Sequence, residues 1–192
     1  MYLDPFALCV IFLGLGLGAF VKGMAGAGLP LVAVPIISVF LGVEHAVIVL
    51  QVPNILANFW LIWSNKSQFK ITKLRFDLIL PPAITVVIGT WFLSSADKEA
   101  TVILLAAILG AFLVLLWFKP GFKLANRTER VVTPVVGTIG GFLQGATGVS
   151  GPIFASLLYS LRLSKEGFIF YNGLLYGFFN SLQLVAMLIF GM

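Results

Sequence analysis

Two glycine-rich stretches, GMAGAGLP at 23–30 and GATGVSGP at 145–152, carry the residue types in this chain that are best suited to holding an ion. Each stretch ends in proline, which is best tolerated in the first turn of a helix, and glycines allow backbone angles that other residues resist. We therefore expect one helix to end and another to begin at each stretch. The free N–H groups and the partial positive charge at a new helix start favour an anion.

Polar side chains beside the two stretches are candidates for the same site. Lys22 could contact an anion, or it could extend its ammonium to the membrane interface as an anchor. Asn58 and Asn180 could donate hydrogen bonds to an oxyanion or could bond neighbouring helices. Ser150 is placed to cap the helix that follows it. The predicted substrate-binding residues are Lys22, Gly23, Gly26, Gly28, Pro30, Asn58, Gln144, Gly145, Thr147, Gly148, Ser150, Gly151, Pro152 and Asn180.

Four other glycines have a spacing that predicts helix packing rather than ion binding. Gly14 and Gly18 are four residues apart, and so are Gly137 and Gly141. Small residues at this spacing let two helices approach closely.

The composition identifies the solvent in which these stretches must lie. Of the 192 residues, 60% are hydrophobic and 10% are charged, whereas soluble domains have about 25% charged residues. Runs of 19 residues without a charge occur at 78–96 and 100–118, close to the roughly 20 residues that cross a bilayer. The sequence predicts an all-α, polytopic membrane protein.

The same composition excludes several classes of function. With one cysteine and one histidine, the chain offers no multi-cysteine metal site and no nucleophile–base–orienter set. It also lacks a phosphate-binding loop of the form GxxxxGK[ST]. We expect neither an enzyme nor a cofactor. The net charge of +5 is concentrated in short loops, so we expect it to set membrane topology rather than to bind nucleic acid.

Eight apolar segments follow one another along the chain, and three of them are short for a full crossing. Their predicted bounds are 5–21, 29–42, 46–64, 78–96, 100–118, 131–143, 152–163 and 167–192. The short ones, at 29–42, 131–143 and 152–163, could be tilted or could be half-helices meeting inside the membrane. The loops at 64–77 and 119–130 are basic, and the loop at 97–99 is net negative. Because basic short loops stay cytoplasmic, the two basic loops should face the cytoplasm.

The chain contains an internal repeat. Shifting the sequence by 122 residues aligns ten identical residues between 18 and 62, several of them Gly, Pro, Glu or Asn. We predict a first repeat at 1–122, with about five segments, and an incomplete second repeat at 123–192, with about three. An odd number of crossings in the first repeat would place the second in the opposite orientation, as in inverted-topology repeats. Parallel repeats would require 5–42 to form one broken span.

The paired stretches GAFVKGMAGAGLPLVAVP, at 18–35, and GGFLQGATGVSGPIFASL, at 140–157, resemble those of the sulfite exporter TauE/SafE family. The resemblance covers residues from about 13 to 192. It implies a transporter of the cytoplasmic membrane for small sulfur-containing or organic anions. Ala27 and Leu29 stand where family members often have more glycine.

We therefore predict a secondary transporter that exports a small anion, such as sulfite or sulfoacetate, across the inner membrane by alternating access. An anion channel and a non-transporting subunit of a membrane assembly are the alternatives. The expected partners are the anionic substrate and the lipid bilayer, with a coupling ion (proton or sodium) and a homo-oligomer left open.

Overall fold

The computed structural model describes residues 4–71, 75–118, 129–161 and 163–192. These ranges contain helices and no strand, which confirms the all-α prediction. The α-helices are α1 (Pro5–Ala25), α2 (Leu29–Ser64), α3 (Leu80–Ser95), α4 (Lys98–Phe118), α5 (Glu129–Thr147), α6 (Gly151–Ser160) and α7 (Lys165–Phe190). Two short 3-10 helices, η1 (Lys66–Lys70) and η2 (Phe76–Leu78), precede α3.

Four helical stretches in the described residues are long and apolar enough to cross a membrane: Pro5–Ala25, Leu29–Ser64, Phe76–Ser95 and Lys165–Phe190. Their outward faces carry large apolar side chains such as Phe12, Trp60 and Ile84. Such faces are stable against lipid, and helices satisfy their own backbone polar groups there. The chain is a multi-pass membrane protein.

Helices end and begin at both glycine-rich stretches. The helix α1 ends at Ala25, four residues beyond the predicted bound at 21, and Gly26 follows with a left-handed φ of 75°. At the second stretch Gly148, just after α5, has a φ of 71°. A left-handed residue after the last helical turn is the usual place for glycine, because a β-carbon would be strained there.

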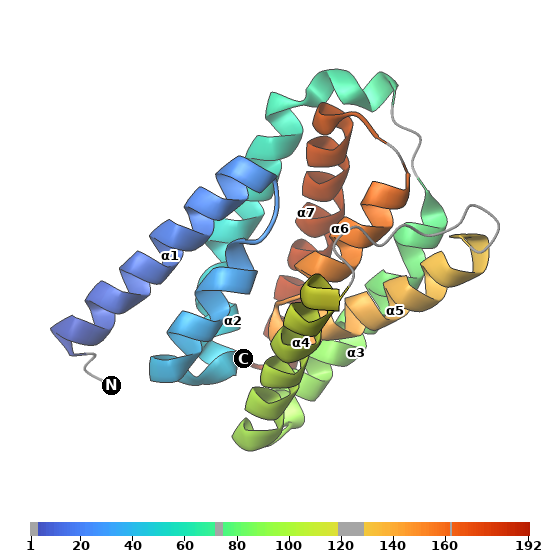
Figure 1. The fold of residues 1–192 in the computed structure, drawn as a ribbon. Coiled ribbons are helices and arrows are strands. Elements are labelled where there is room, and N and C mark those ends of the chain that lie inside the picture. Colours follow the sequence, from blue (N-terminus) through green and yellow to red (C-terminus); the bar gives the residue numbers. More distant parts are fainter. Residues whose placement is uncertain (1–3, 72–74, 119–128, 162) are drawn as a thin grey trace.

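A kink divides α2 into two parts. Gly42 has non-helical angles, φ 78° and ψ 164°, within the helix. The kink lies at the predicted boundary between the segments 29–42 and 46–64. In Figure 1 the first part of α2 runs from the middle of the molecule to its lower end, where the chain turns and rises again. The helix α6 starts near the middle too, but runs toward the upper end.

Close glycine contacts hold several helices together. A β-carbon added at Gly141 would lie 2.3 Å from the carbonyl oxygen of Pro82 in α3, and one at Gly18 would lie 2.8 Å from that of Leu29. At Gly14 the nearest atom would be the Ile36 side chain, at 2.9 Å, and at Gly137 it would be that of Pro82, at 3.1 Å. The predicted packing role of these glycines is confirmed.

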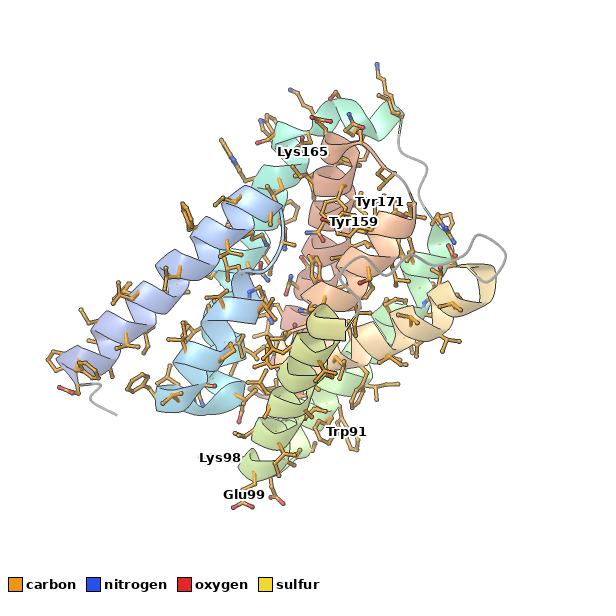
Figure 2. All side chains as sticks on the ribbon, viewed as in Figure 1. Trp91, Lys98, Glu99, Tyr159, Lys165 and Tyr171 are labelled. Atoms are coloured by element: carbon orange, nitrogen blue, oxygen red, sulfur yellow. The ribbon has the colours of Figure 1, made fainter. Side chains whose placement is uncertain are left out.

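The two ends of the molecule carry different loops. Figure 2 shows Lys165 at the upper end, beside η1, and Lys98 with Glu99 at the lower end. The basic residues of η1 thus lie at the end opposite the 97–99 turn. Most of the second basic loop, at 119–128, and the predicted repeat boundary at 122 lie outside the described residues.

Candidate functional site

One cavity in the interior is lined by both glycine-rich stretches. The first stretch and its neighbours contribute Lys22, Ala27, Gly28, Pro30 and Leu31. The second stretch contributes Gly148, Val149, Ser150 and Gly151. The rest of the wall is formed by Asn54 of α2 and by Asn172 and Tyr176 of α7. A smaller adjoining cavity shares Pro30, Asn54 and Gly148, and reaches Gln51 and Asn180. Residues more than a hundred positions apart therefore surround the same space.

The cavity is narrow. Its free volume of about 10 Å³ is close to the minimum for one water molecule. An oxyanion with several heavy atoms would fit only after the walls had separated.

Lys22 reaches the cavity from α1. The residue is only 5% exposed, so its ammonium does not extend outward as an interfacial anchor would. Its Nζ donates a hydrogen bond of 2.6 Å to Oδ1 of Asn58 and another to Oδ1 of Asn54. Among the described residues, no carboxylate is found within ion-pair distance of it. The buried amine of Lys22 is thus held by two neutral amides.

The second half of the chain places a neutral side chain at the equivalent position. Gln144 is fully buried, and its Nε2 donates to Oδ1 of Asn180 at 3.1 Å and to Oε1 of Gln183 at 3.3 Å. Its Oε1 accepts a hydrogen bond of 2.7 Å from the hydroxyl of Ser150.

The prediction that Ser150 caps α6 through its side chain is wrong. Ser150 occupies the N-cap position, but its hydroxyl makes no capping hydrogen bond. The hydroxyl donates to Gln144 instead, and it lies 3.2 Å from the hydroxyl of Tyr176. Leaving the buried Oε1 of Gln144 without a donor would destabilise the fold. The Ser150 hydroxyl therefore bonds Gln144 rather than accepting a hydrogen bond from a backbone N–H group of α6.

Two sets of contacts in the two halves match after the shift of 122 residues. Lys22 contacts Asn58 in the first half, and Gln144 contacts Asn180 in the second. A β-carbon at Gly26 would lie 3.0 Å from Ile169 of α7, and one at Gly148 would lie 3.3 Å from Val47 of α2. Because 47 and 169 are also equivalent, each half contacts the other through the same pair of positions.

Three buried polar atoms near the cavities have no hydrogen-bond partner: Oε1 of Gln51, Nδ2 of Asn58 and Oδ1 of Asn172. The amide of Asn172 does hold the first stretch, because its Nδ2 donates to the carbonyl oxygen of Gly26 at 2.6 Å. Buried polar groups are normally paired, and unpaired ones call for an explanation such as a ligand.

The predicted site residues divide into three groups. Those that line the two cavities are Lys22, Gly28, Pro30, Gly148, Ser150, Gly151 and Asn180. Asn58, Gln144 and Gly26 lie one layer behind and bond the lining residues.

The remaining predicted residues, Gly23, Gly145, Thr147 and Pro152, do not line either cavity. Gly23 is exposed on α1, and Thr147 bonds the carbonyl oxygen of Leu143. Gly145 packs on α3, where a β-carbon would lie 2.1 Å from the carbonyl oxygen of Val86.

Asn54, Asn172 and Tyr176 line the cavity but were not among the predicted site residues. The repeat contained a signal for two of them, because Asn54 and Tyr176 are 122 residues apart and both are polar. The repeat is defined by identical residues, and Asn54 and Tyr176 are not identical, so this pair does not stand out in the sequence.

Apolar membrane-spanning helices surround an internal cavity whose wall includes buried polar side chains such as Lys22, Asn54 and Ser150, which defines a multi-pass helical membrane protein. The chain belongs to the sulfite exporter TauE/SafE family, whose sequence model matches residues 10–192. The predicted resemblance is confirmed, and the family is one of membrane transporters rather than enzymes. No match was found among curated proteins or among solved structures.

Proposed function

We propose that this protein is a secondary transporter that exports a small anion, sulfite or a related organosulfur or organic anion, across the cytoplasmic membrane by alternating access. The observation that carries the proposal is the shared cavity: the starts of α2 and α6 and the buried Lys22 all border one space. The N–H groups of a first helical turn have no partner within the helix. Two such turns and one amine that border the same cavity would favour an anion there.

Inverted repeats provide the symmetry that alternating access requires. The reciprocal contacts Gly26–Ile169 and Gly148–Val47 support them, because two units related by a two-fold axis exchange the same pair of positions. The opposite directions of α6 and the first part of α2 in Figure 1 also agree with an axis in the membrane plane. The kink at Gly42 and the start of α7 would then face opposite sides.

The side chains at the cavity suit an oxyanion better than a metal cation. The amine of Lys22 and the hydroxyl of Tyr176, which line the cavity, can donate to oxygen atoms, and the unpaired Nδ2 of Asn58 lies just behind them. No group of three or more His, Cys, Asp or Glu occurs among the described residues. The small volume of the cavity supports a transporter over a channel, because a channel needs a continuous path whereas a transporter encloses its substrate.

The test is binding and flux with purified protein. Thermal stability should rise with sulfite or sulfoacetate, because a ligand that binds only the folded state stabilises it. In proteoliposomes, efflux of the same anion should saturate with concentration. Lys22→Met should weaken both, whereas Lys98→Met, which removes an exposed lysine at the lower end of the molecule, should change neither. Equal effects of the two variants, or flux that never saturates, would contradict the proposal.

A further inference from the structure

The hydrogen bonds of Lys22 leave room for one more acceptor. An ammonium has three N–H donors, and a neutral amine has two. Asn54 and Asn58 accept two hydrogen bonds from Nζ, and no third acceptor is found among the described residues. The two amides therefore accept both N–H groups of a neutral amine, while the charged form has one donor left, on a side chain that lines the cavity.

Gln144, at the equivalent position in the second half, has no unused N–H group. Both N–H groups of the Gln144 amide are used, by Asn180 and Gln183, and its oxygen accepts from Ser150. The difference between the two halves is thus one donor and one charge, both at Lys22.

Within the part of the chain that the structure describes, no acidic group lies near enough to balance a charge on Lys22. On α7, the titratable residue that lines the same cavity is Tyr176, and a phenol carries no charge that could balance an ammonium. On α2, Glu44 and His45 lie at least nine residues before Asn54, or roughly 14 Å along a helix. On α1, Cys9 is thirteen residues away, or about 20 Å. Burying a charge without a partner is unfavourable, so the ammonium needs a counter-ion from the cavity.

We propose that Lys22 takes up one proton as the anion enters the cavity, so that anion and proton cross the membrane together. The neutral amine, a proton from water and the anion combine into an ammonium–anion pair, in which the third N–H of Nζ donates to the anion. Leaving reverses the step on the other side. This inference rests on the proposed function, and it adds the coupling ion.

The experiment is titration calorimetry of sulfoacetate and sulfite binding to the protein in detergent, in buffers of different ionisation enthalpy, across pH 6–9. The wild type should take up one more proton per bound anion than Lys22→Arg, whose guanidinium stays charged. Any proton exchanged by the anion itself cancels in this difference. Affinity for sulfoacetate, whose own charge does not change across this range, should fall about tenfold per pH unit in the wild type at the alkaline end and stay level in Lys22→Arg.

Lys22→Gln, which copies the side chain of the second half, keeps the test decisive if Lys22→Arg does not fold; it should bind more weakly and take up no such proton. Lys98→Met is the matched control and should behave as the wild type. Binding with the same proton count in the wild type and the Lys22 variants would overturn the inference and leave the proposed function standing. Binding of neither anion by any variant would contradict both.

Discussion

Replacing Gly26 by alanine tests whether the first helix end must have its present shape. Gly26 has a φ of 75°, and a non-glycine residue in this conformation costs about 1–2 kcal/mol. The new β-carbon would also lie 3.0 Å from Cγ1 of Ile169, and overpacking of this kind costs about 1–3 kcal/mol. Together the two effects predict a loss of about 2–5 kcal/mol in the free energy of unfolding.

Two other glycines separate these contributions. Gly191 has the same φ of 75° with no atom within 4 Å of an added β-carbon, and Gly148 has a φ of 71° with Val47 at 3.3 Å. Gly191→Ala should therefore lose only the backbone part, about 1–2 kcal/mol or less. The loss of unfolding free energy in Gly148→Ala should lie between those of Gly191→Ala and Gly26→Ala.

The assay is reversible unfolding of each variant in detergent, with anion efflux from proteoliposomes measured in parallel. The Gly26 and Gly148 variants should lose efflux, and the Gly191 variant should keep it. Were Gly26→Ala as stable and as active as Gly191→Ala, neither the left-handed end of α1 nor its contact with α7 would be needed, and the reasoning would fail.

Three further predictions concern packing and topology. Gly145→Ala should destabilise the α3–α5 pair by about 1–3 kcal/mol, because its β-carbon would meet the Val86 carbonyl oxygen at 2.1 Å; Gly110→Ala, with open space around it, should not, as denaturant unfolding would show. Gln144→Leu should lower the unfolding free energy by about 2 kcal/mol or more, since it leaves buried amides and a hydroxyl unpaired. An unchanged free energy would show that the hydrogen bonds of Gln144 do not stabilise the fold. Single cysteines at 43 and 164, in a chain whose own cysteine is replaced by serine, should react with impermeant reagents from opposite sides; labelling from one side would end the inverted-repeat proposal.

The sequence predicted the starts of the helices better than their ends, because glycine and proline act on the backbone locally. It placed the start of α2 at Leu29, and it separated the segments 29–42 and 46–64 where the structure has a kink at Gly42 within one helix. The end of α1 was set too early because Gly23 remains helical. Glycine permits a helix to end but does not force it to. The helix α1 ends where Nδ2 of Asn172 donates a hydrogen bond to the carbonyl oxygen of Gly26.

The cavity wall was harder to predict than the helix ends. Asn54 and Asn172 line it because of how α2 and α7 are rotated about their axes, and that rotation is set by packing between distant helices. The local rule for Ser150 likewise gave way to a partner six residues earlier, Gln144. Contacts of this kind depend on the assembled bundle rather than on the neighbouring sequence.

The narrowness of the cavity has a consequence for binding strength. Its free volume of about 10 Å³ has room for about one water molecule, so an arriving oxyanion must meet a wider conformer. The apparent dissociation constant then equals the intrinsic one divided by the fraction of wide conformers. Substitutions that loosen the contact between Gly148 and Val47 would raise that fraction, and would tighten binding without adding a single contact to the ion.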